Sequence, residues 1–76
     1  MNIGNDIRRL REVFNALEPG RYTQAACANR ATMSRSQWCD IEHDRWSPRL
    51  TTLDRIAAAM GVEVEVVFRE KLRAGY

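Results

Sequence analysis

The sequence predicts a mainly α fold: a compact bundle of four helices followed by a C-terminal β-strand. Three observations predict it. Apolar residues recur at helical spacing, residues typical of helix starts and stops separate the periodic segments, and the pattern changes to strict alternation after Gly61. With 76 residues, 45% of them apolar and 29% charged, the chain is expected to form a single domain, residues 1–76.

The first helix is expected over residues 3–17, because its apolar residues fall at alternating steps of four and three. The following "EPG" ends it, since proline disfavours helical conformation in the residue before it. The charged residues between the apolar positions, Arg11 among them, are expected to face solvent. The apolar stripe consists of Ile3, Ile7, Leu10, Phe14 and Leu17.

Two short helices are expected next, over residues 24–30 and 34–43. The Thr23 hydroxyl can cap the first of them. Ser34 and Gln37 have the S-x-x-Q spacing of a capping box at the start of the second, and Trp38 and Ile41 share its inward face. Two short helices joined by a turn of three or four residues are the components of a helix-turn-helix.

A fourth helix is expected over residues 51–60, with Gly61 as its stop, followed by a strand over residues 62–69. A lone strand leaves its backbone hydrogen-bonding groups unpaired. It pairs either with a strand that the pattern does not reveal or with its copy in a second chain. We favour the second arrangement, a homodimer whose interface would contain Val62, Val64, Val66 and Phe68.

The composition argues against an enzyme, a metal protein and a membrane protein. Cys27, Cys39 and His43 lack the paired spacing of a structural zinc site, so both cysteines are expected to be packing residues and no metal or cofactor is expected. No nucleophile–base spacing or glycine-rich phosphate loop is present. Without a long apolar run or a signal-peptide core, the protein is expected in the cytoplasm.

In this order, the motifs "IG..IR.LR", "TQ...A", "MSRSQW..IE" and "SPRL..L..IA.AMGV" resemble the lambda-repressor-like, Cro/cI-type (XRE family) helix-turn-helix domain. The resemblance implies a lambda-repressor-like bundle whose recognition helix runs from Ser34 to Glu42. It also implies that Gln24 bonds a DNA phosphate and braces that helix. The base-reading positions that it implies are Arg35, Ser36 and Asp40, with Gln37 close by.

Other residues around the motif are candidates for phosphate contacts. Arginine presents a planar fork suited to phosphate or guanine, and eleven of the twelve basic residues are arginine. Basic and hydroxyl side chains bracket the two short helices at both ends. Besides Gln24, the candidate phosphate-binding residues are Arg21, Thr23, Ser34, Arg45, Ser47 and Arg49.

The sequence departs from the family at several positions. Thr32 stands where the turn usually carries glycine, so either the turn has another shape or some strain is tolerated. Cys27 replaces a usual leucine and Trp38 a usual isoleucine or valine, which we interpret as compensating changes in volume. The connection from Arg11 to Gln24 is longer than in the family, and a longer first helix with its "EPGRY" loop would absorb it.

These observations predict a sequence-specific regulator of transcription, a repressor that binds double-stranded DNA as a homodimer. The rival hypothesis is a protein-interaction module, such as an antitoxin or a phage-encoded protein that binds a toxin or another partner, with weak or no DNA binding. The net charge of only +2 and an acidic flank at Asp40, Glu42 and Asp44 favour the rival.

Overall fold

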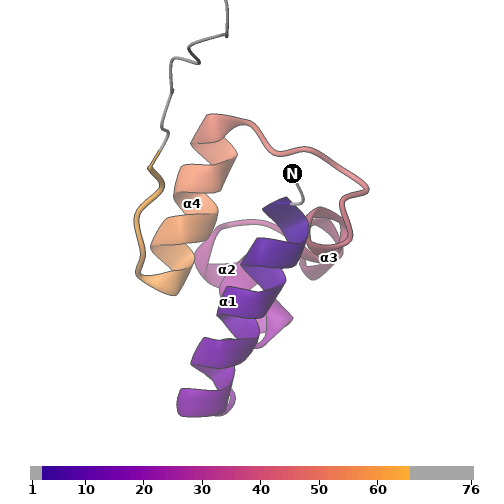
Figure 1. The fold of residues 1–76 in the computed structure, drawn as a ribbon. Helices are drawn as coiled ribbons and strands as arrows, with labels where there is room; N and C mark the ends of the chain where they lie inside the picture. The colour runs from indigo at the N-terminus through magenta and orange to yellow at the C-terminus, as the bar shows by residue number, and fades with distance from the viewer. Residues whose placement is uncertain (1–2, 66–76) are drawn as a thin grey trace, which may run out of the picture.

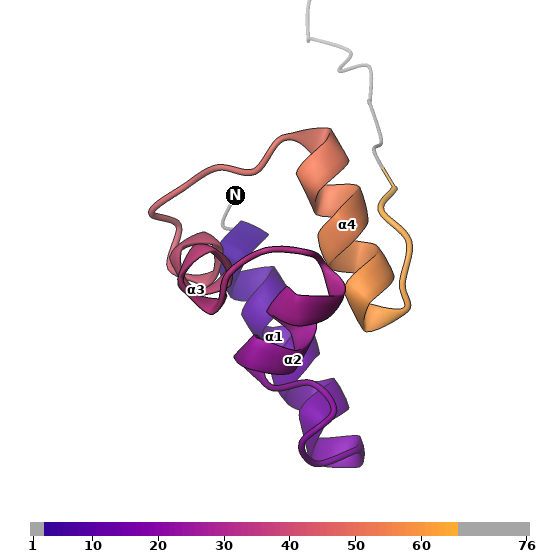
Figure 2. The same ribbon diagram turned by 180° about the vertical axis from the view of Figure 1, so that it is seen from behind.

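The computed structural model describes residues 3–65 and confirms the four predicted helices: α1 (Ile3–Leu17), α2 (Gln24–Arg30), α3 (Arg35–Glu42) and α4 (Leu50–Met60). α1 lies in front of α2, with α3 and α4 on either side of it (Figure 1). The reverse view shows α2 in front, and α2 packs against both α3 and α4 (Figure 2). None of the described helices is both long and apolar enough to cross a membrane.

The helix ends follow the local sequence. The Thr23 hydroxyl accepts a hydrogen bond from the Ala26 amide at the start of α2. At α3 both bonds of the predicted capping box form, from the Gln37 amide to Ser34 Oγ (3.1 Å) and from the Ser34 amide to Gln37 Oε1 (3.0 Å). Gly61 ends α4 in the left-handed conformation, at φ 72°.

The core lies where α1, α2, α3 and α4 meet. Its largest fully buried side chains are Trp38, Ile41, Ile56 and Cys27, so the packing role predicted for Cys27 is confirmed. Cys39 differs from the prediction: it is only half-buried on α3, with its sulfur 3.5 Å from Nδ1 of His43. Its position one residue after Trp38 turns it away from the core.

α1 begins directly against the C-terminal end of α3. A Cβ atom at Gly4 would lie 2.2 Å from the Ile41 carbonyl oxygen and 2.8 Å from that of Glu42, so only glycine fits without movement of the backbone. The Gly4 amide donates a hydrogen bond of 3.1 Å to the Asp44 carboxylate. This contact attaches the start of α1 to the end of α3.

The predicted strand is not confirmed. Within the described part of the chain, residues 62–65 have no regular secondary structure, and residues 66–69 of the prediction lie outside it. The alternation itself is present, because Val62 and Val64 are half-buried while Glu63 and Glu65 are exposed. A strand requires a second strand to bond its backbone, and these four residues have no such neighbour among residues 3–65.

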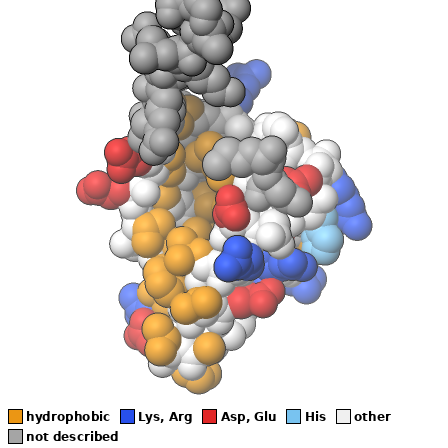
Figure 3. Space-filling model, viewed as in Figure 1, with side chains coloured by type: hydrophobic (Ala, Val, Ile, Leu, Met, Phe, Trp, Pro, Cys, Tyr) orange, Lys and Arg blue, Asp and Glu red, His pale blue; other side chains and the backbone are white. Residues whose placement is uncertain are grey.

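An apolar face lies beside these residues. Figure 3 shows apolar side chains gathered along the length of α1 on the side turned toward α4. A groove between the two helices is lined by Ile7, Leu10, Leu53 and Val62, among other residues. Toward the end of α1 the face becomes exposed: Val13 has 57% and Leu17 75% of its surface accessible.

Candidate nucleic-acid interface

α2 and α3 are joined by residues 31–34, which is the connectivity of a helix-turn-helix. The turn is a Schellman motif: the Met33 amide bonds the Ala28 carbonyl (3.0 Å) and the Thr32 amide bonds the Asn29 carbonyl (3.1 Å). Thr32 occupies the left-handed position of that motif, at φ 58°. The turn therefore keeps the shape that glycine favours, and a β-branched residue tolerates the strain.

α3 has an inner and an outer face. Trp38, Ile41 and Glu42 are buried, with at most 4% of any of them exposed. The remaining side chains of the helix are exposed or half-buried, and the predicted base-reading residues fall on this outer surface. They are Arg35, Ser36, Gln37 and Asp40.

Arg35 and Arg49 differ from most other arginines of the described chain, because neither makes a hydrogen bond or an ion pair. Arg35 occupies the first position of α3, and Arg49 is the residue immediately before α4. Asp40 is engaged instead, in an ion pair of 3.3 Å with Arg45. Gln37 is held by the capping box, so its amide oxygen already has a donor.

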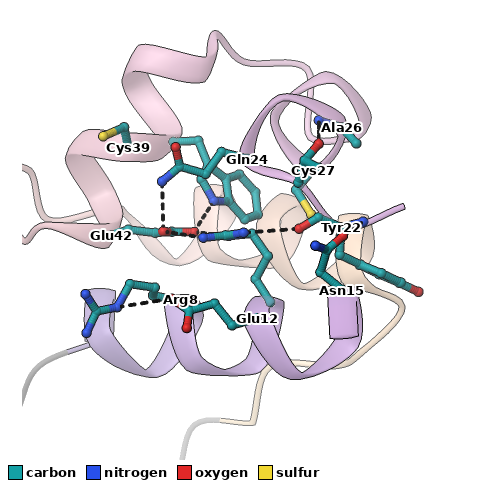
Figure 4. A network of polar contacts seen from close by, with 12 residues as sticks. Arg8, Glu12, Asn15, Tyr22, Gln24, Ala26, Cys27, Cys39 and Glu42 are labelled. Carbon is teal, nitrogen blue, oxygen red and sulfur yellow. Dashed lines mark hydrogen bonds and ion pairs between the residues drawn. The ribbon is translucent and has the colours of Figure 1, made fainter. Parts of the chain in front are cut away.

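A buried carboxylate joins α3 to the rest of the fold. Glu42 accepts hydrogen bonds on one oxygen from Arg11 Nη2 (3.1 Å) and Gln24 Nε2 (3.0 Å), and on the other from Arg11 Nε and the Trp38 indole. Figure 4 shows Gln24 and Glu42 facing each other across this network. We call Arg11, Gln24, Trp38 and Glu42 the Glu42 cluster; it connects α1, α2 and α3.

The Glu42 cluster keeps its carboxylate ionised. Burial alone would raise the pKa of Glu42, but the hydrogen bonds from Arg11, Gln24 and Trp38 outweigh it and lower the pKa below its usual value. The same pairing raises the pKa of Arg11. The prediction that Arg11 faces solvent is wrong, because its side chain is only 12% accessible. Arg11 follows Ile7 by one helical turn, so it borders the apolar stripe. This spacing could have indicated that Arg11 is partly buried.

Gln24 is positioned by the cluster at the start of α2. One N–H of its amide donates to Glu42, and the side chain is half-buried. The contact joins the first residue of α2 to the last residue of α3. Gln24 is thus fixed relative to α3, as the sequence resemblance implies.

The other candidate phosphate-binding residues divide between the two ends of the motif. Thr23 caps α2, while Arg21 lies within 3.8 Å of Glu18 and against the Tyr22 ring. Ser34 caps α3. The remaining candidates lie in the connection between α3 and α4, where all three are exposed: Arg45, Ser47 and Arg49.

Two further arginines bond main-chain carbonyl groups, and no pattern in the sequence indicated these contacts. Arg30 Nε donates to the Ala59 carbonyl (2.8 Å), connecting α2 to α4. Arg55 on α4 donates to the carbonyls of Ala31 and Thr32 in the turn before α3. Carbonyl acceptors carry no residue-specific signal, which is why these contacts could not be predicted.

The fold and this surface define a small helical protein in which α2 and α3 form a helix-turn-helix, and α3 begins with an arginine that has no partner among the described residues. The chain is similar to a protein described as the immunity repressor protein of Bacillus phage phi105: 35% identical over 71 residues, which are 93% of this chain. The chain spans 45% of that relative's length. No family model and no solved structure matches the chain.

Proposed function

We propose that this chain is a lambda-repressor-like (XRE family) repressor of transcription that binds specific sites in double-stranded DNA, and that it is not an enzyme. The observation that carries the proposal is the division of α3 into an inner face fixed by the Glu42 cluster and an outer face that begins with Arg35, which has no partner in the part of the chain that the structure describes. Similarity to a protein named an immunity repressor supports the same function.

In the proposed complex, α3 enters the major groove, which admits one helix and displays a distinct donor and acceptor pattern for each base pair. Arg35 donates two parallel hydrogen bonds to guanine, a contact worth about 1–3 kcal/mol of discrimination between bases. Ser36 contacts a neighbouring base edge or phosphate. Asp40 accepts from a cytosine amino group, after release or sharing of its ion pair with Arg45.

The phosphate contacts provide affinity that does not depend on sequence. Gln24 uses the second N–H of its side-chain amide, because the first is bonded to Glu42. Arg49 and Ser47 contact the backbone from the connection before α4, where both are exposed. α3 then lies between two lines of phosphate contacts, one from α2 and one from this connection.

We further propose that two copies form the binding unit. An antiparallel pair of the predicted strands, residues 62–69, would give each strand the neighbour that its backbone hydrogen-bonding groups need. The apolar face along α1 and α4 lies next to residues 62–65 and would be partly covered in the dimer. The two α3 helices would then meet successive major grooves, about 34 Å apart, on a near-palindromic site.

DNA binding is tested by titrating the protein against random duplexes and duplexes selected from a random library, at two salt concentrations. We expect a sequence preference and affinity that falls steeply with salt. Arg35→Ala should relax the preference at one base position, whereas Arg49→Ala should weaken binding to all duplexes about equally. Identical behaviour of the two variants would contradict these roles.

The dimer is tested by sedimentation of the full chain with Val62→Ser and Val64→Ser, beside a chain truncated after Gly61. Both changes should lower the molecular mass to that of a monomer. A mass equal to that of the wild-type dimer in both cases would contradict the proposed role of residues 62–69, and a monomeric wild type would contradict dimerisation itself.

The alternative function, a module that binds a toxin or another protein, drew support from the acidic flank of α3. Each of those carboxylates has a partner within the fold: Glu42 is buried in its cluster, Asp40 pairs with Arg45, and Asp44 accepts the Gly4 amide. The guanidinium groups of Arg11 and Arg45 offset the charges of Glu42 and Asp40, so these two carboxylates repel phosphate less. Absence of DNA binding even at low salt would favour the interaction module.

A further inference from the structure

We propose that Arg55 is the positioning residue that sets the angle of α3 and so the reach of Arg35 toward a base. This inference rests on the proposed DNA-binding function. Arg55 itself lies on α4 and is assigned no contact with DNA. It acts through the turn between α2 and α3, where the chain carries Thr32 at the left-handed position.

The guanidinium group of Arg55 donates hydrogen bonds to two successive main-chain carbonyl groups. Arg55 Nε and Nη2 both donate to the Ala31 oxygen, at 3.0 and 2.7 Å, and Nη2 also donates to the Thr32 oxygen at 2.6 Å. All three bonds come from one planar guanidinium, a geometry that an ammonium group cannot reproduce. Ile56, the next residue, is 2% exposed, so this part of α4 is anchored in the core.

The turn needs such a restraint because of the residue it contains. A β-branched residue strongly disfavours a φ of 58°, so Thr32 would move toward another conformation if it were free to do so. The Schellman bonds resist this from the α2 side. Arg55 resists it from outside, by bonding the carbonyls of the two peptide groups on either side of the Thr32 Cα.

The consequence falls on the start of α3. The inner-face contacts of that helix are made by Trp38, Ile41 and Glu42, in its middle and at its C-terminal end. Arg35, at the other end, follows Thr32 by three residues, and its exposed side chain makes no hydrogen bond or ion pair within the described part of the chain. A small rotation at the turn therefore displaces Arg35 while the buried end of the helix stays in place.

The first test uses fluorescence anisotropy to measure affinity for two duplexes. One is selected from a random library by the wild-type chain, and the other is a scrambled version of it. Arg55→Met keeps the apolar stem and removes the fork; Arg9→Met removes the same charge from an exposed arginine on α1. Arg55→Met should lower the selected-to-scrambled ratio about tenfold, the effect of losing one base contact, and Arg9→Met should lower it less than about twofold. Arg55→Lys should resemble Arg55→Met.

Rescue distinguishes positioning from direct contact. Adding Thr32→Gly to Arg55→Met relieves the backbone strain, so the ratio should recover toward the wild-type value. A role as a phosphate ligand predicts the opposite: equal loss on both duplexes, larger than for Arg9→Met, and no rescue by glycine. An equal loss of affinity for both duplexes would overturn the inference, and so would a selected-to-scrambled ratio that Thr32→Gly does not restore.

The second test does not need DNA. Amide hydrogen exchange should accelerate at Thr32 and Met33 in Arg55→Met, slow again when Thr32→Gly is added, and stay unchanged at Glu18, whose amide bonds Phe14 far from the turn. Unchanged exchange at Thr32 and Met33 would overturn the inference whatever the DNA result. If the wild-type chain selects no duplex but the exchange pattern is as expected, the proposed function fails and the restraint on the turn stands.

Discussion

Replacing Glu42 with glutamine tests whether the Glu42 cluster holds the fold together. Glutamine has nearly the same shape, but it is neutral and has only one oxygen. In the wild type each carboxylate oxygen accepts two hydrogen bonds, from Arg11 and Gln24 on one side and from Arg11 and Trp38 on the other. Whichever way the new amide is turned, its NH2 group faces two donors, and Arg11 loses its counter-ion.

The expected loss is large relative to the stability of the domain. Removing one partner of a buried ion pair costs about 3–5 kcal/mol, and here the side chains of Arg11 and Glu42 are 12% and 0% accessible. A chain of 76 residues has a total unfolding free energy of about 4–11 kcal/mol. Glu42→Gln should therefore lower the melting temperature by about 12 °C or more.

Glu12→Gln is the matched control, because it removes the same charge from an exposed pair. Glu12 lies 3.7 Å from Arg8, with side-chain exposures of 61% and 46%, and such pairs contribute about 0–1 kcal/mol. Urea unfolding followed by circular dichroism gives the free energies of both variants and of Arg11→Met with Glu42→Gln. The double variant should lose less than the sum of its single changes, since it leaves no unpaired charge.

The reasoning fails if Glu42→Gln unfolds within about 1 kcal/mol of the wild type, as the exposed control should. It also fails if the losses of Arg11→Met and Glu42→Gln simply add, because the two side chains would then not act as a pair. The first result would mean that the Glu42 cluster contributes little to the stability of the fold, and the second that pairing between Arg11 and Glu42 is not the source of its contribution.

Three other perturbations follow from the same contacts. The pKa of Glu42 is lowered in the folded state, so the stability that this carboxylate contributes should be complete above the ordinary pKa of 4.5 and should decline as pH falls through the folded pKa. Melting temperatures across this pH range should show the decline in the wild type and a flatter profile in Glu42→Gln. Gly4→Ala should destabilise by about 1–3 kcal/mol in thermal melts, although alanine is the better helix former, because its Cβ would meet the Ile41 carbonyl; an unchanged or raised melting temperature would contradict this. Cys27→Leu should lose about 1–3 kcal/mol by overpacking a site with no exposed surface, and combining it with Trp38→Ile should cost less than the sum of the single changes; strictly additive losses would disprove the compensation of volumes.

The sequence was sufficient for the helices and for the two faces of α3. Thr23 caps the start of α2, Ser34 with Gln37 caps the start of α3, and Gly61 ends α4. Each of these residues acts on backbone groups within a few residues of itself. The burial of Trp38 followed from helical spacing alone. Such features could be predicted because the interacting groups are neighbours along the chain.

The tertiary structure alone decided which polar groups meet. Arg11 and Glu42 are separated by 31 residues, and Arg55 and the Ala31 carbonyl by 24. No periodicity links such positions, since their proximity depends on how the helices pack. Packing also decided that Asp44 accepts the Gly4 amide, 40 residues away, and that Arg35 has no partner in the described chain. Local hydrogen bonding and hydrophobic spacing determine the helices, whereas the long-range contacts between them determine which charges remain available on the surface of α3.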